Sequence, residues 1–194
     1  IERSIESAVT AWKNRVPGRV GFGAGVAREL GKNDRRMQYG GMHADPEVGI
    51  IRVEDAKGKL LGVAFNYGCH PSTLDLHSFK FTEDWPYYSI RGIKEKVGKN
   101  VWVAFYQSAQ GDSKVGYTAE LSAVGAEMNI RTFEYAEYKG NMMVDAVLKV
   151  LPSIKTSSSL DVAVTEKNFE LPAREGYRLT AEEAQKQADA AKAA

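Results

Sequence analysis

The stretch from residue 62 to residue 74 constrains the fold most, because an apolar run ends there abruptly at a histidine followed by a proline. Residues 63–65 are typical of a buried strand, and Gly68 and Pro71 are expected to end it. His70 then lies at or just past the carboxyl end of that strand. In open α/β sheets this is where ligands and catalytic groups gather, so His70 is a candidate functional residue.

A second buried strand is predicted at residues 100–106, after a helix over residues 85–97 that ends at Gly98. A helix between two buried strands favours a right-handed crossover, which makes the strands parallel. Both strands should therefore end at the same edge of the sheet. The loop at His70 and the loop at residues 107–113 would then face one crevice.

A β-hairpin is predicted just before His70. Residues 48–54 and 60–66 are apolar strands, and Gly58 supplies the left-handed turn residue between them. An amphipathic helix is expected at residues 2–15. The glycine-rich segment at residues 19–26 reads as a strand packed closely by other backbone, since no preceding strand supports a nucleotide-binding loop.

Further elements are a long helix at residues 126–151, a strand at residues 159–171 and a helix at residues 180–194 that a capping box would start. Together these predict an α/β fold with a mixed, largely parallel sheet flanked by helices. We expect residues 1–194 to form a single domain or a segment of a larger domain, with a helical tail at residues 176–194.

Composition excludes several classes of protein. Lys and Arg number 26 against 25 Asp and Glu, so no electrostatic footprint for nucleic acid is expected. No apolar run approaches the roughly 20 residues of a membrane span. The single cysteine, Cys69, excludes an internal disulfide and is expected to be buried and inert. The chain opens on Ile1 rather than methionine, which favours a processed or excised segment.

Several polar residues are candidates for substrate binding. Arg35 and Arg36 could hold an anionic or carbonyl group, or be solvated. Ser72 and Thr73 could donate to substrate or bond to the turn after the proline. Asp84 could be a helix N-cap or place a carboxylate near the histidine. His43 and His77 are interpreted as surface residues.

Three segments together resemble the neutral/alkaline, non-lysosomal ceramidase family and its bacterial relatives. They are Phe-Asn-Tyr-Gly-Cys-His-Pro-Ser-Thr at residues 65–73, Thr-Glu-Asp at residues 82–84 and Phe-Tyr-Gln-Ser-Ala-Gln-Gly-Asp at residues 105–112. The similarity runs from about residue 16 to residue 171. It implies that the chain is part of a zinc amidase that cleaves the N-acyl bond of ceramide, a lipid amide, and that is secreted, periplasmic or lumenal.

The resemblance also implies a ligand set. The family holds zinc with two histidines, a glutamate and a tyrosine, and His70 matches the second histidine. The other three ligands match no residue of this chain, so further chain segments would complete the site. A zinc ion held in this way would activate water and polarise an amide carbonyl. Asp84, Asp112 or a backbone carbonyl could fix the tautomer of the histidine.

One departure from the family concerns the loop after the second buried strand. Characterised ceramidases read Gly-Asp-x-Ser-Pro there, whereas this chain reads Gly-Asp-Ser-Lys-Val at residues 111–115. Ser113 and Asp112 remain the candidate catalytic residues, with the serine one position early. Two alternatives stay open: a zinc hydrolase of another amide or ester, and a catalytically degenerate protein that binds a lipid or a partner.

Overall fold

The structure is a computed structural model, and it describes residues 1–33, 44–74, 78–115, 131–171 and 179–193. The chain divides into two units, Ile1–Leu160 and Asp161–Ala194. Each unit is described by itself below.

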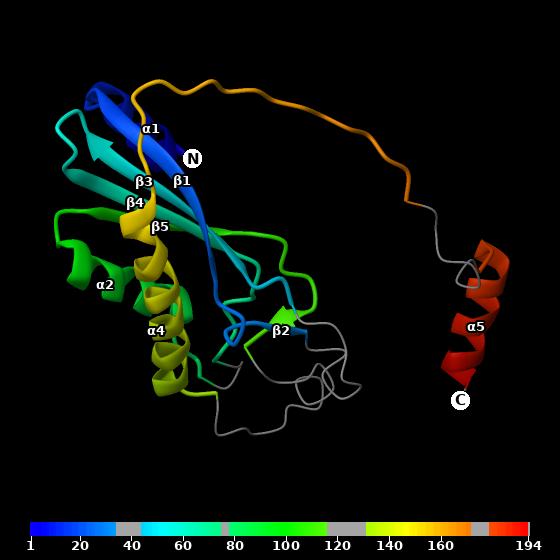
Figure 1. The fold of residues 1–194 in the computed structure, drawn as a ribbon. Helices are drawn as coiled ribbons and strands as arrows, with labels where there is room; N and C mark the ends of the chain where they lie inside the picture. Colours follow the sequence, from blue (N-terminus) through cyan, green and yellow to red (C-terminus); the bar gives the residue numbers. More distant parts are fainter. Residues whose placement is uncertain (34–43, 75–77, 116–130, 172–178, 194) are drawn as a thin grey trace. The chain divides into compact units, whose positions relative to one another are not determined.

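A four-stranded sheet forms the centre of the first unit (Figure 1). Its strands, in spatial order, are β1 (Gly18–Val26), β3 (Glu47–Asp55), β4 (Leu60–Tyr67) and β5 (Trp102–Gln107). β1 and β3 pair antiparallel, as do β3 and β4, whereas β4 and β5 pair parallel. The predicted mixed α/β fold is confirmed, as is the parallel pair that delivers both candidate loops. Antiparallel pairing predominates in the described sheet, because the hairpin and β1 make up most of it.

The predicted hairpin is formed by β3 and β4. Gly58 has φ of +85°, the left-handed conformation that its turn requires. The Asp55 carboxylate accepts hydrogen bonds from the backbone N–H groups of Lys57 and Lys59, at 2.8 and 2.9 Å. The turn therefore fixes the register that carries His70 to the far end of β4.

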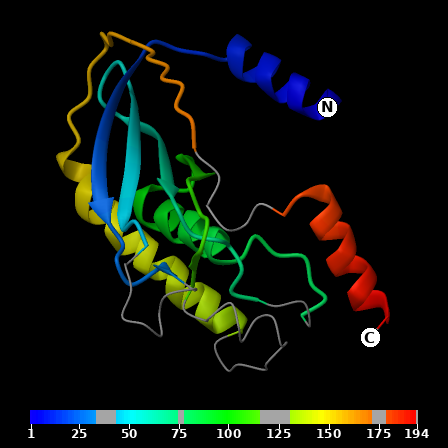
Figure 2. The same cartoon turned by 90° about the vertical axis from the view of Figure 1, so that its right-hand side faces the viewer.

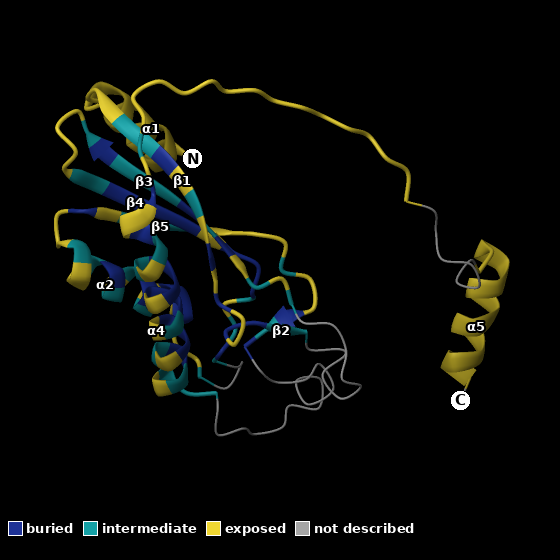
Figure 3. Ribbon diagram, viewed as in Figure 1, coloured by how far each residue is buried: buried dark blue, intermediate teal, exposed yellow. Residues whose placement is uncertain are grey.

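Two helices cover one face of the sheet (Figures 1 and 2). α2 (Trp85–Val97) has the bounds expected from the sequence. α4 (Phe133–Val150) begins later than predicted, while residues 126–130 lie outside the described residues, and it continues into the short η2 (Leu151–Ser153). The buried residues gather between these helices and the sheet (Figure 3).

Aromatic side chains join α2 to the ends of β4 and β5. The rings of Phe65 and Phe105 lie 5.4 Å apart, and Trp85 lies 5.0 Å from Phe105 and 6.3 Å from Tyr67, edge to face in both cases. Such contacts add to the burial of apolar area. They fix the first turn of α2 beneath the loop that follows β4.

The glycines of β1 allow the segment after α4 to lie directly on the sheet. A Cβ atom at Gly21 would lie 2.2 Å from the carbonyl oxygen of Lys155, and one at Gly23 would lie 2.7 Å from Ile154. This is the close backbone packing that the glycine-rich sequence predicts.

Smaller elements complete the first unit. β2 (Lys32–Asn33) pairs antiparallel with β6 (Ser113–Lys114). The predicted N-terminal helix is present as α1 (Glu2–Lys13), and none of its residues is buried. Among the described residues, no helix combines the length and apolar character needed to cross a bilayer.

The prediction of a strand at residues 159–171 is wrong. These residues form no strand and are exposed, although apolar and polar residues alternate there. The last pairing is a single bridge between Ser157 and Val20, beyond which the segment has no partner strand. The second unit contains α5 (Ala181–Ala193), and the capping box is confirmed by reciprocal hydrogen bonds between Thr180 and Glu183.

Candidate functional site

The loops that follow β4 and β5 meet at one edge of the sheet, as their parallel pairing requires. The backbone N–H of His70 donates to the carbonyl of Ser113 at 2.9 Å. The side-chain amide of Gln107 donates to the carbonyls of Tyr67 and Cys69, at 3.3 and 3.1 Å. The two loops that were predicted to meet at this edge are therefore bonded directly to each other.

His70 is held through its backbone, and the residue is partly exposed. Its carbonyl accepts from the backbone N–H of Ser72 at 2.9 Å and from the indole N–H of Trp85 at 3.3 Å. These bonds fix the position of the peptide groups on both sides of the His70 Cα atom.

Asp84 clamps the histidine loop to α2. Its carboxylate accepts from the backbone N–H of Trp85 at 2.8 Å, which confirms the predicted N-cap, and from that of Leu74 at 3.0 Å. Its own N–H donates to the hydroxyl of Thr82. The residue is buried, so these bonds replace the water that its carboxylate would otherwise bind.

Three buried polar side-chain atoms in the two loops have no hydrogen-bond partner among the described residues. They are the hydroxyl oxygen of Thr73, the amide oxygen of Gln110 and the hydroxyl oxygen of Ser113. Leaving such a group unpaired costs about 1–3 kcal/mol, so each case requires an explanation.

A buried polar layer lies below Ser113. Tyr67 donates to the carbonyl of Ala27 at 2.8 Å and accepts from the N–H of Gly31 at 3.2 Å, and burial raises its pKa to about 12. Burial also raises the pKa of the Cys69 thiol to about 12. Cys69 is fully buried, which confirms the predicted burial, and a buried thiol with a raised pKa is expected to be unreactive.

Lys139 of α4 is a buried cation that the sequence interpretation missed. Its ammonium donates to the carbonyl of Glu29 at 2.6 Å, and desolvation lowers its pKa. Its burial could have been predicted from its place on the apolar face of the helix, three residues after Ala136 and four before Met143. Lys139 thereby ties α4 to the segment that leads into β2.

Backbone strain falls in the same two loops. Among the described residues other than glycine, positive φ occurs at Phe79, Asp84 and Asp112, at +47°, +58° and +58°. Each follows β4 or β5 along the chain and precedes the next element. Strain of this kind costs about 1–3 kcal/mol and clusters at functional sites.

The other predicted site residues are placed as follows. Ser72, Thr73, Asp84, Asp112 and Ser113 lie in the two bonded loops, with Ser113 in β6 and buried. Arg35, Arg36, His43 and His77 lie outside the described residues.

A catalytic zinc ion usually takes at least three protein ligands. Nowhere in the described part of the chain do three His, Cys, Asp or Glu side chains come together in a way that could hold a metal ion. The described residues therefore do not by themselves form a complete zinc site.

The comparisons with known proteins concern the fold. No family model and no curated protein matches the sequence. The neutral ceramidase from Pseudomonas aeruginosa is similar with a TM-score of 0.61 and 16% identity, over 75% of this chain and 24% of that chain. A ceramidase complexed with C2 is similar with a TM-score of 0.56 and 19% identity, over 69% of this chain and 22% of that one.

These likenesses establish the class of fold to which the chain belongs. The chain has the α/β fold found in part of these ceramidase structures, which confirms the fold implied by the resemblance in sequence. It spans about a quarter of the length of the structures that it matches.

Proposed function

We propose that the edge of the sheet at His70 takes part in zinc-dependent hydrolysis of the N-acyl bond of a ceramide-like lipid amide. The observation that carries the proposal is the hydrogen bond from His70 to Ser113, which joins the two loops within a fold shared with ceramidases. The unpartnered polar atoms of Thr73, Gln110 and Ser113 support it, because a reacting amide and its water would use such groups.

In this proposal His70 supplies one zinc ligand. The remaining ligands come from further chain segments. The role of the described residues is to hold the imidazole in place through its backbone bonds to Ser72, Ser113 and Trp85. Arg35 and Arg36 are proposed to contact the polar part of the substrate.

Ser113 is proposed to bind the reacting group or its water through its unpartnered hydroxyl, next to Asp112. The substitution Ser113→Ala removes that hydroxyl but keeps the carbonyl that accepts from His70. We expect turnover to fall by about 10- to 100-fold with zinc content and melting temperature unchanged, since a positioned polar group contributes about that much. Ser157→Ala, which removes an exposed hydroxyl, is the control. If the melting temperature falls far enough to explain the loss of activity by unfolding, Ser113 has a structural role instead.

The substrate class is tested with the protein expressed from its complete gene. A fluorescent short-chain ceramide, the matched fatty-acid ester and an unrelated N-acyl amino acid are incubated with and without zinc, and the released fatty acid is measured. Zinc-dependent release from the ceramide supports the proposal, and release from another substrate alone redirects it to a different hydrolase.

The second candidate function is a binding protein without turnover. The burial of Ser113 and its displacement by one position from the family pattern favour this alternative. Saturable binding of the fluorescent ceramide without release of fatty acid, at any zinc concentration, would establish it.

We also infer that the protein works outside the cytoplasm, in the secreted or periplasmic fraction, as the ceramidase resemblance implies. Fractionation of the source cells with an antibody to the chain tests this inference. Recovery with the cytoplasmic markers would contradict it.

A further inference from the structure

One face of the central sheet is apolar and has no layer packed on it by the described residues of the first unit, Ile1–Leu160. The strand register places its side chains in three rows across β1, β3, β4 and β5. The rows are Val20, Val53, Gly62 and Trp102; Phe22, Ile51, Ala64 and Ala104; and Ala24, Gly49, Asn66 and Tyr106. We call these twelve residues the open sheet face.

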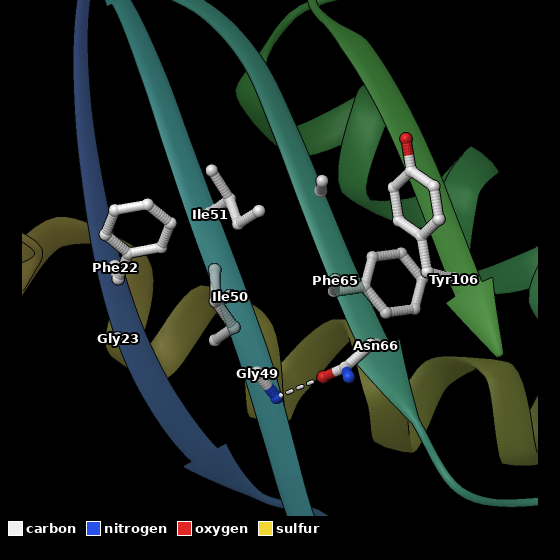
Figure 4. Close-up of a pocket in the computed structure, with 9 residues that line it drawn as sticks. Phe22, Gly23, Gly49, Ile50, Ile51, Phe65, Asn66 and Tyr106 are labelled. Atoms are coloured by element: carbon white, nitrogen blue, oxygen red, sulfur yellow. Dashed lines mark hydrogen bonds between the residues drawn. The ribbon is translucent and has the colours of Figure 1, made fainter. Parts of the chain in front are cut away.

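Figure 4 shows Phe22, Ile51 and Tyr106 on the open sheet face, with the helices behind the strands. Phe22 is 64% exposed, Tyr106 61% and Trp102 45%. A sheet ordinarily buries an apolar face against another layer, and monomers rarely leave so continuous an apolar patch in water. The open sheet face therefore requires an occupant.

The shape of the face favours a polypeptide layer over a small ligand. Its hollow measures about 380 Å³ and lies at the centre of a surface that is four strands wide. Asn66 and Tyr106 supply the polar side chains of the hollow, and the Asn66 amide oxygen already accepts from the N–H of Gly49. Small-molecule sites are more enclosed and bring several polar groups together, whereas a flat apolar sheet face suits a second packed layer.

The comparison structures indicate where that layer comes from. Both share this fold, yet the matched region is 24% of one chain and 22% of the other. In those proteins the shared region lies within a chain about four times as long as that region. We propose that the open sheet face is the seat of a second apolar layer, supplied by further residues of the same protein.

This proposal rests on the fold and the open sheet face, and it is independent of zinc and of amide hydrolysis. It locates the further chain segments that the proposed active site requires. Because the rows of the open sheet face continue to Asn66 and Tyr106, near the carboxyl ends of β4 and β5, the added layer would lie next to the His70 loop.

Hydroxyl-radical footprinting of the protein expressed from its complete gene tests the proposal. Phe22, Trp102 and Tyr106 should be labelled at least tenfold more slowly than Tyr138, which is 54% exposed on α4 and serves as the internal control. Labelling of all four at similar rates would overturn the proposal. Protection that disappears on dilution would also overturn it, because the occupant would then be a second copy of the chain.

A pair of substitutions provides an independent measurement. Ala104→Asp puts a charge on the open sheet face, and Ala11→Asp puts the same charge on the exposed helix α1. Ala104→Asp should lower the melting temperature strongly and make Phe22 and Tyr106 accessible to labelling, whereas Ala11→Asp should do neither. Equal, small effects of the two changes would show that the face is solvated and would contradict the proposal.

Discussion

At the scale of single residues, the candidate site depends on backbone contacts more than on side-chain pairs. His70 is held by three bonds to its peptide groups, and Asp84 binds two backbone N–H groups rather than a side chain. This arrangement fixes the loops rigidly enough to keep unpaired polar atoms at Thr73 and Ser113.

The clamp at Asp84 gives a stability prediction. Asp84→Ala removes the N-cap and leaves the N–H groups of Leu74 and Trp85 without their acceptor. We expect the free energy of unfolding to fall by about 2–4 kcal/mol, as the sum of a lost cap and buried unpaired donors. Urea denaturation measures the change. Glu83→Ala, at the exposed neighbouring position, should change it by less than about 0.5 kcal/mol, and equal losses in both variants would exclude the clamp.

Single residues also mark the limit of what the sequence could predict. His70, the cap at Asp84 and the burial of Cys69 followed from local patterns, because a strand, a proline and a helix start each leave a short-range signal. The contacts of Lys139 and Gln107 could not be predicted from local patterns, because their hydrogen-bond partners lie 110 and 38–40 residues away in sequence. Long-range pairs of this kind follow only from the fold.

At the scale of elements, the packing of β1 depends on the glycines at alternate positions of its sequence. Its alternating glycines leave room for the segment after α4, which crosses close to the strand. The substitution Gly21→Ala should therefore lower the free energy of unfolding by about 1–3 kcal/mol, as other overpacked sites do. Thermal or urea unfolding measures the loss. Gly111→Ala is the matched control, because no atom lies within 4 Å of its Cβ position, and a neutral Gly21→Ala would contradict the close packing.

An ionic network joins β3 to β1 and to the segment after α4. Glu54 accepts from Thr156 and Arg52, and Arg19 donates to Thr156. The hydrogen bond from Thr156, followed by the bond and charge of Arg52, holds the pKa of Glu54 below its usual 4.5.

Because the pKa of Glu54 is lower in the folded than in the unfolded protein, its stabilising contribution is present above about pH 4.5. It is lost as the pH falls through the lowered folded value. Glu54→Gln should therefore be less stable than the wild type at pH 7 and should lose less stability on acidification. Urea unfolding at pH 7 and pH 3 measures the difference, with Glu47→Gln at an exposed position of the same strand as control. An unchanged pH dependence in Glu54→Gln would exclude the network.

The predicted strand at residues 159–171 shows why alternation alone does not make a strand. The pattern is present, but a strand also needs a neighbour with free backbone groups, and pairing ends at Ser157. The prediction of the β3–β4 hairpin was correct for the opposite reason, because β4 begins only five residues after β3 ends and the two strands pair with each other.

At the scale of the whole molecule, the chain has part of a ceramidase-like fold, with the candidate site at one edge of the sheet and an open sheet face. The helices bury one side of the sheet, and the two loops at its edge carry the candidate site. The layer that we propose over the open sheet face could also supply the further ligands that the proposed zinc site at His70 requires.

The zinc content of the His70→Ala variant, expressed from its complete gene, tests the central proposal most directly. Zinc should fall from about one ion per chain to near zero, and hydrolysis of the fluorescent ceramide should fall by at least about 100-fold. His77→Ala, the matched histidine control, should keep both zinc and hydrolysis. Full zinc occupancy in His70→Ala, or equal losses in the two variants, would contradict the assignment of His70 as a metal ligand.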